Sequence, residues 1–207
     1  MIILILAPHT DDGEFGCGGT ISKFVRAGHD VYYVAFSAAE KSVPNGFPHD
    51  ILRKEVVEAT SVLGIDQSHL QILDFEVRNF PLHRQEILDV MVNLEKSVDP
   101  DMVLLPSTSD THQDHQTISS EGFRIFKKTT MLGYEAPANN LTFETNVFIE
   151  LSDSDLEAKT KSLLHYESQK FRGIFNSDYI TCLARVRGGQ IGVKYAETFE
   201  AIRWVIR

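Results

Sequence analysis

The feature that most constrains the fold is a purely apolar run at residues 2–6, which is followed closely by the segment His9-Thr10-Asp11-Asp12. The run is too short to span a membrane and is rich in isoleucine, which is typical of a buried strand in a parallel sheet. In open α/β sheets, ligands bind beyond the carboxyl ends of the strands. We therefore expect the histidine and the two acids to lie at the edge of the sheet where such proteins carry out their chemistry.

Strand-like and helix-like segments alternate over the first 130 residues. Their patterns predict strands at residues 2–7, 31–36, 70–73 and 102–105, and helices at residues 18–27, 51–63, 81–96 and 113–127. Less regular patterns in the last third predict strands at residues 131–135, 146–151 and 197–205 and helices at residues 153–166 and 180–187. This order predicts an α/β fold with a Rossmann-like, mostly parallel sheet and helices on both faces.

Length and composition limit the classes of protein to which the chain can belong. At 207 residues we expect a single domain, residues 1–207, with a core large enough to be stable. A net charge of −9 without a basic stripe argues against a nucleic-acid partner. No apolar segment approaches the roughly 20 residues of a membrane span. The chain has two cysteines and no signal pattern at the amino end, so we expect a cytoplasmic protein. Whether it forms a homo-oligomer stays an open question.

The first polar cluster has the residue types of a metal site. Divalent transition metals bind imidazole nitrogen and carboxylate oxygen. His9 and Asp12 are three residues apart and can converge on one ion, whereas Asp11 would point away from the ion but stay beside its bound water. That position suits a general base. The alternative is that the two acids only cap the following helix.

A second cluster, His112-Gln113-Asp114-His115, follows the strand predicted at residues 102–105. Its two histidines are three residues apart at the expected start of a helix, so both can face one cavity. One of them can complete the metal site as a third ligand, and the other can stay close to a reacting carbonyl. Asp114 can then orient a histidine and favour its charged form. The alternative is a solvated polar loop in which Asp110 or Thr111 caps the helix.

Together the two clusters resemble the signature motifs of the LmbE-like (PIG-L) family of zinc-dependent N-acetylglucosamine deacetylases. The resemblance rests on His9-x-Asp11-Asp12, on the stretch Gly16-Cys17-Gly18-Gly19-Thr20 and on His112-x-Asp114-His115. The family usually shows A-H-P-D-D-E, whereas Gly13 stands here at the position of that glutamate and Glu14 follows one residue later.

The resemblance implies a role for each residue of the site. Zinc, or another divalent transition metal, is bound by His9, Asp12 and His115. Asp11 is the general base. His112 is the general acid or the group that stabilises the oxyanion, and Asp114 orients it.

It also implies an activity, which is the hydrolytic removal of the N-acetyl group from an N-acetylated amino sugar or its conjugate. Arg53 matches a family arginine that contacts substrate, and its alternative is a solvated helix residue. Asp110, in the loop before the second cluster, is a further candidate for substrate contact. Two other functions stay open: an amidase of the same family that acts on a larger acyl group or a thiol-conjugate amide, and a non-catalytic sugar-binding module.

Overall fold

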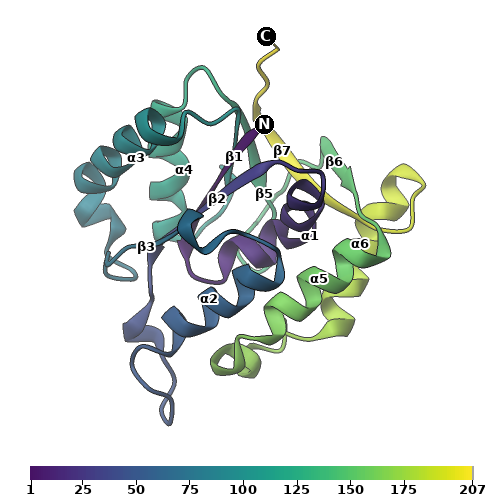
Figure 1. The fold of residues 1–207 in the computed structure, drawn as a ribbon, viewed down its shortest axis with the longest axis horizontal. Coiled ribbons are helices and arrows are strands. Elements are labelled where there is room, and N and C mark those ends of the chain that lie inside the picture. Colours follow the sequence, from purple (N-terminus) through teal and green to yellow (C-terminus); the bar gives the residue numbers. More distant parts are fainter. Residues whose placement is uncertain (207) are drawn as a thin grey trace.

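The computed structural model describes residues 1–206, which form one seven-stranded sheet covered by helices (Figure 1). The strands are β1 (Ile2–His9), β2 (Asp30–Ser37), β3 (Leu70–Ile72), β4 (Met102–Pro106), β5 (Thr130–Tyr134), β6 (Val147–Glu150) and β7 (Ala196–Arg203). The helices are α1 (Asp12–Arg26), α2 (Ile51–Val62), α3 (Arg84–Val98), α4 (Gln113–Ile125), α5 (Asp153–Leu164) and α6 (Ser177–Ile191). Short 3₁₀ turns lie at Glu40–Ser42, Gln67–His69, Phe80–His83 and Glu167–Arg172. Within the described residues, no helix combines the length and the apolar character that a membrane crossing requires.

The strands are ordered β3-β2-β1-β4-β5-β7-β6. The five strands from β3 to β5 are parallel to one another, and β7 runs antiparallel to both β5 and β6. The predicted α/β class and the mostly parallel sheet are therefore confirmed. Because the chain moves outward from β1 to β2 and β3, and then returns to β4 on the other side of β1, the order reverses between β1 and β4. This reversal leaves a crevice at the carboxyl ends of the two strands, where ligands bind in such sheets.

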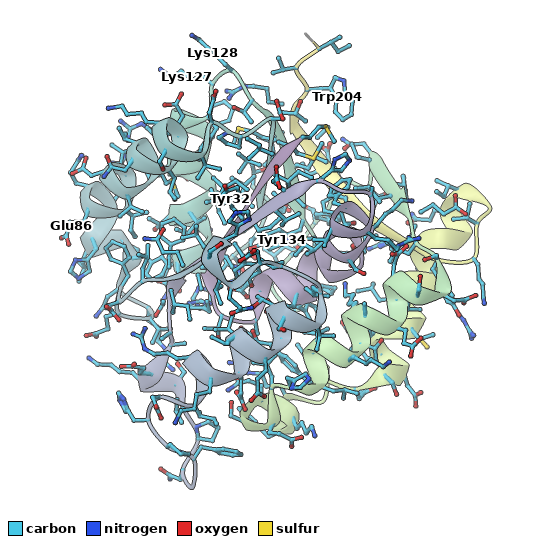
Figure 2. The ribbon with its side chains drawn as sticks, in the orientation of Figure 1. Tyr32, Glu86, Lys127, Lys128, Tyr134 and Trp204 are labelled. Atoms are coloured by element: carbon cyan, nitrogen blue, oxygen red, sulfur yellow. The ribbon has the colours of Figure 1, made fainter. Side chains whose placement is uncertain are left out.

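Side chains of β1 alternate between the two faces of the sheet, and both faces are buried. Ile3 and Ile5 belong to an apolar cluster with residues of α1, α2, α5 and α6, whereas Leu4 and Leu6 pack with residues of α3 and α4. This explains the unbroken apolar run in the sequence, since a strand that is covered on both sides needs no polar face. Figure 2 shows Tyr134 within the body of the domain, where its hydroxyl donates to the Leu6 carbonyl at 3.1 Å.

The structure corrects the predicted start of α1. The helix begins at Asp12 rather than near residue 18, and it is kinked at Cys17, whose φ is −145°. The glycine-rich stretch is therefore helical, and its glycines allow the helix to approach its neighbours closely. A Cβ on Gly13 would lie 2.5 Å from the Tyr33 ring, and one on Gly16 would collide with Tyr134. These glycines serve close packing and do not form a turn.

Two backbone N–H groups that follow the kink form hydrogen bonds with a side chain of β7. Gly19 and Thr20 donate to the two carboxylate oxygens of Glu197, at 3.0 and 2.7 Å. Lys159 of α5 donates to the same carboxylate at 2.6 Å, and the two side chains of this ion pair are only 7% and 5% exposed. Glu197 and Lys159 thus connect the helix that carries Asp12 to the last strand and to α5.

Lys159→Met should lower the free energy of unfolding by about 3 kcal/mol, because it leaves the Glu197 charge buried without its partner. Urea denaturation at neutral pH measures this change. The double variant Lys159→Met/Glu197→Gln is the control, and it should recover part of the loss because the buried charge is gone. A single variant that is as stable as the wild type would show that the ion pair is not needed.

The other elements of the last third follow the predicted order. β5, β6, β7 and α5 match their predicted ranges to within a few residues. α6 is longer than predicted: it is capped at its start by Asn176, whose side chain accepts from the Tyr179 N–H, and it ends at Gly192, whose φ is +76°. Gly188 and Gly189 lie inside this helix, and glycine disfavours helices, which is why the sequence predicted a shorter one.

Candidate active site

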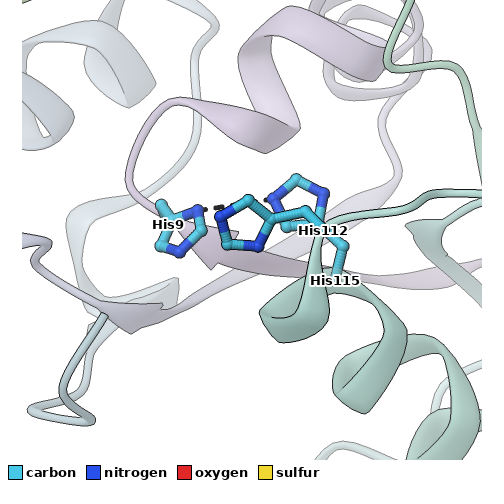
Figure 3. Close-up of side chains that lie close together, drawn as sticks. All are labelled: His9, His112 and His115. Atoms are coloured by element: carbon cyan, nitrogen blue, oxygen red, sulfur yellow. Dashed lines mark hydrogen bonds between the residues drawn. The ribbon is translucent and has the colours of Figure 1, made fainter. Parts of the chain in front are cut away.

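Both polar clusters meet at the carboxyl ends of β1 and β4. His9 ends β1, while His112 and His115 lie at the start of α4, and Figure 3 shows the three rings side by side. Nδ1 of His9 lies 3.4 Å from Nε2 of His115. Oδ2 of Asp12 lies 3.0 Å from the first nitrogen and 3.2 Å from the second. Motifs about one hundred residues apart in the sequence therefore form one site.

The spacing of these three atoms suits a metal ion. A tetrahedral zinc ion bound at 2.0–2.1 Å keeps its ligand atoms roughly 3.3–3.4 Å apart. The three observed separations, 3.0, 3.2 and 3.4 Å, are close to that value. His112 is also near, since one ring nitrogen from each of the three histidines lies within 4.8 Å of the others. Nδ1 of His112 accepts from the Asp114 N–H at 3.2 Å, which leaves its Nε2 for a ligand.

Two buried carboxylates hold the outer nitrogens of the rings. Oδ2 of Asp110 lies 2.7 Å from Nδ1 of His115, and Oδ2 of Asp114 lies 2.9 Å from Nε2 of His9. Each carboxylate is fully buried. A carboxylate at one ring nitrogen fixes the proton there, so the other nitrogen can present its lone pair to a metal. The two carboxylates thus leave Nδ1 of His9 and Nε2 of His115 facing each other and Asp12.

Two predicted site residues have partners that differ from the expected ones. Asp110, a predicted substrate contact, is 1% exposed and instead holds His115, while its Oδ1 accepts from the His112 N–H at 2.8 Å. Asp114, a predicted partner of His112, directs its carboxylate to His9 and accepts from the Arg78 N–H at 2.6 Å. Residue types alone did not reveal these partners, because Asp110 and Asp114 each lie within five residues of both His112 and His115, and His9 is 105 residues from Asp114.

The two adjacent acids are in different environments. His115 and His9 outweigh the effect of burial and hold the pKa of Asp12 well below its usual range. Burial and then the charge of Asp12 raise the pKa of Asp11, although Arg172 opposes the rise. Asp12 is therefore a permanent anion that faces two imidazoles, whereas Asp11 has the higher proton affinity. Pairs of titratable groups whose pKa values are pushed apart are a common basis for acid and base roles.

The helix-capping alternatives do not account for these residues. Asp11 is the N-cap of α1, but its side chain makes no capping hydrogen bond. α4 is capped by His112 itself, whose ring accepts from the Asp114 N–H. Asp12 and Asp110 outweigh burial and raise the pKa of His115 to about 10. A metal ion must displace that proton, so metal binding should tighten as the pH rises.

A cavity of about 390 Å³ opens over the cluster, and Asp11 and His112 lie in its wall. Its rim comes from the segments after β2, β3 and β5 and from the turn Glu167–Arg172. Arg53, the other expected substrate contact, does not line this cavity. Its Nε donates to Glu40 at 2.8 Å and another nitrogen pairs with Asp74. These residues line an adjoining cavity of about 200 Å³.

Glu14 is a residue of the site that the sequence did not assign. It is completely buried in the first turns of α1, with its carboxyl oxygens against the hydroxyls of Tyr33 and Tyr166. The same hydroxyls donate to the Thr10 carbonyl at 2.9 and 2.7 Å. Glu14 therefore fixes the segment between His9 and Asp11 to β2 and to the chain after α5. The two tyrosines are far from Glu14 in sequence, so no local pattern indicates the contact.

Glu14→Gln should remove a pH dependence of stability. Burial raises the pKa of Glu14 to about 8, so the folded protein keeps a proton that the unfolded chain loses above about pH 4.5. The free energy of unfolding of the metal-free protein should therefore fall between pH 5 and 8, by at most about 1.4 kcal/mol per pH unit from this group. Urea titrations at pH 5, 6.5 and 8 should show the variant gaining on the wild type as the pH rises. If the free energies of unfolding of the variant and the wild type changed in parallel with pH, the raised pKa of Glu14 would be contradicted.

Comparison with known proteins adds a family to this geometry. A model of the PIG-L family, described as GlcNAc-PI de-N-acetylase, matches residues 4–126, a range that includes both polar clusters. A diacetylchitobiose deacetylase from Thermococcus kodakarensis is 26% identical over 219 aligned residues, which cover 94% of this chain and 80% of the relative.

Solved structures share the whole architecture. A conserved protein from Thermus thermophilus is 26% identical and superposes with a TM-score of 0.80, covering 99% of this chain and 96% of its own. An N,N'-diacetylchitobiose deacetylase from Pyrococcus horikoshii, 23% identical, gives a TM-score of 0.80 and covers 96% of this chain and 82% of its own. The second likeness supports the fold only.

Proposed function

The chain belongs to the PIG-L family, and we propose that it is a zinc-dependent hydrolase that removes the N-acetyl group from an N-acetylated amino sugar or a conjugate of such a sugar. One observation carries the proposal. Metal-ligand atoms of His9, Asp12 and His115 converge within 3.4 Å of one another in the wall of the cavity that also contains Asp11. The deacetylase named among its relatives supports an acetylated amino sugar as the substrate.

His9, Asp12 and His115 would hold the metal, and zinc fits their two nitrogens and one oxygen. When bound, the ion would polarise the acetamide carbonyl and lower the pKa of a water molecule. Other divalent transition metals accept the same ligands. Asp110 and Asp114 would keep His115 and His9 oriented, and such outer carboxylates typically contribute 10–100-fold to metal affinity or activity.

Asp11 and His112 would handle the protons. Asp11 lines the cavity beside the metal ligands and would accept the proton of the attacking water. His112 would hydrogen-bond to the oxyanion through the proton on Nε2, and Asp11 would then pass the proton that it took from the water to the leaving amine. Burial, followed by the charges of His115 and His9, lowers the pKa of His112, which favours the neutral ring with its proton on Nε2, since Nδ1 accepts from the Asp114 N–H.

Amine release from acylated amino sugars tests this function. The substrates are N-acetylglucosamine, its methyl β-glycoside and the N-butanoyl analogue of that glycoside, each with and without a chelator. Release from the acetyl compounds, and its loss with chelator, would support the proposal. A strong preference for the butanoyl analogue would favour an amidase of larger acyl groups. If the zinc-loaded protein released no amine from any of them, the proposed activity would be wrong.

A further inference from the structure

The rim of the active-site cavity carries two arginines, Arg78 and Arg172, from separate segments of the chain. Arg78 follows β3, and Arg172 ends the turn Glu167–Arg172. Neither arginine accepts or donates a proton in the reaction proposed above, although Arg172 lies 3.6 Å from the carboxylate of Asp11. Their surroundings distinguish them from the other charged side chains near the site.

Arg78 lacks a carboxylate partner for its guanidinium. Its Nη2 donates to the Ser42 hydroxyl at 3.1 Å, and no ion pair of Arg78 occurs among residues 1–206. The hydrogen bond from its backbone N–H to Asp114, at 2.6 Å, fixes the main chain at this residue. Its φ of +72° lies in the region that favours glycine. The carboxylate that orients His9 therefore also sets the position of this arginine.

Arg172 reaches the cavity from a segment that is tied to the site. Tyr166 donates to the Thr10 carbonyl at 2.7 Å, and Ser168 binds the Glu55 carboxylate through its N–H at 2.9 Å and its hydroxyl at 2.6 Å. From this anchored turn, Nη1 of Arg172 comes within 3.6 Å of Oδ2 of Asp11, with its side chain still 43% exposed. Its guanidinium also lies 5.9 Å from the centroid of the Phe171 ring, a contact through the face of the group that leaves its N–H edge able to bind another anion.

Cations in the adjoining cavity provide a contrast. There Arg53 is paired with Glu40 and Asp74, and Lys41 lies 2.6 Å from Glu76. The chain has 29 acidic and only 20 basic Lys and Arg side chains, so carboxylates are abundant. Guanidinium groups match the two oxygens of a carboxylate or phosphate. Two incompletely paired arginines over the candidate active site therefore indicate that the ligand supplies the anion.

We propose that the substrate carries a carboxylate or phosphate group, which Arg78 and Arg172 bind at the rim of the cavity while the acetamide lies over His9 and His115. This inference rests on the proposed deacetylase function and narrows its substrate class to anionic amino-sugar conjugates. The two arginines would then determine specificity, and the neutral part of the sugar would contribute less to selection.

Three substrates that share the N-acetylglucosamine ring and differ in charge test the inference. They are the methyl β-glycoside of N-acetylglucosamine, its carboxymethyl β-glycoside, and N-acetylglucosamine 1-phosphate. We expect kcat/KM at low ionic strength to be at least about 10-fold higher for one of the anionic compounds than for the methyl glycoside, and the advantage should shrink in about 0.5 M salt. The anionic compound that is preferred identifies the group as carboxylate or phosphate. Equal kcat/KM for all three would overturn the inference and leave the deacetylase function standing.

Arg78→Gln and Arg172→Gln should each reduce the preference for the anionic compound about 10-fold, mainly through KM, since a charged hydrogen bond at a rim is worth about 1.4 kcal/mol. Arg185→Gln is the matched control. Arg185 lies on α6 with its guanidinium over the Tyr195 ring, outside the cavity, so its loss should leave the preference intact. If both cavity variants kept the preference of the wild type, these arginines would not be the anion site.

Equilibrium binding gives an answer that does not depend on turnover. Calorimetry with chelator-treated protein should show that an anionic compound binds about 10-fold more tightly than the methyl glycoside, and that Arg78→Gln or Arg172→Gln removes the difference. If no compound were deacetylated but this difference persisted, the proposed reaction would fail and the anion site would stand. Equal binding of all three compounds would refute the anion site whatever the activity.

Discussion

Asp11→Asn is expected to lower kcat by about 10³-fold while the protein still binds one metal ion per chain. Asparagine keeps the shape of the side chain but does not accept a proton from water. Asp11 is not among the three groups whose ligand atoms converge, because Asp12 supplies the oxygen that faces His9 and His115. Steady-state kinetics with an N-acetylglucosaminide that the wild type deacetylates measures kcat. Metal analysis of the same sample measures the number of ions bound per chain.

The control for this variant is Asp89→Asn, which changes an acid on α3 that contacts Gln85 outside the cavity. Its kcat should equal that of the wild type. If Asp11→Asn kept nearly full activity, Asp11 would not be the general base. If the variant lost its metal, Asp11 would be a ligand, and the division of roles between the two adjacent acids would be wrong.

His115→Ala and His112→Ala should separate metal binding from stabilisation of the oxyanion. His115→Ala should weaken metal binding by more than about 100-fold, because it removes a ligand and not only an outer contact. His112→Ala should keep the metal and lower kcat by about 10²-fold or more, since one hydrogen bond to the oxyanion contributes that much. Metal titration followed by kinetics under saturating metal distinguishes the two effects.

This pair of variants also distinguishes two ligand sets. Nitrogens of His9, His112 and His115 lie within 4.8 Å of one another, and a site of three histidines is the alternative to one that uses Asp12. If His112→Ala lost the metal as completely as His115→Ala, the assignment of His112 as the group that stabilises the oxyanion would be contradicted. Normal metal binding by Asp12→Ala would then support the three-histidine set.

Much of the fold could be predicted from the sequence because its strands are buried on both faces. The run at Ile2–His9 and that at Met102–Pro106 are almost wholly apolar, and parallel pairing of β1 with β4 brings their carboxyl ends together. The meeting of His9 with His115 follows from that topology. The convergence of the two polar clusters could therefore be predicted from the order of the strands, whereas the roles of their residues await the variants above.

Side-chain partners were less predictable, because they depend on distances between segments that are remote in sequence. Asp114 lies beside His112 in the chain, yet its carboxylate binds His9. The Arg53 guanidinium is occupied by Glu40 and Asp74, which lie in other loops. The start of α1 was misplaced for the same reason, since Gly13 is explained only by the ring of Tyr33, which packs against it.

The most direct test of the central claim is to count acetate and primary amine released from an N-acetylglucosaminide by zinc-loaded, chelator-treated and zinc-restored protein. A hydrolase that uses the site formed by His9, Asp12 and His115 should release the two products in equal amounts, stop when the metal is removed, and recover when one zinc ion per chain is returned. Release that continues at the same rate without metal, or zinc-loaded protein that releases neither product, would contradict the account.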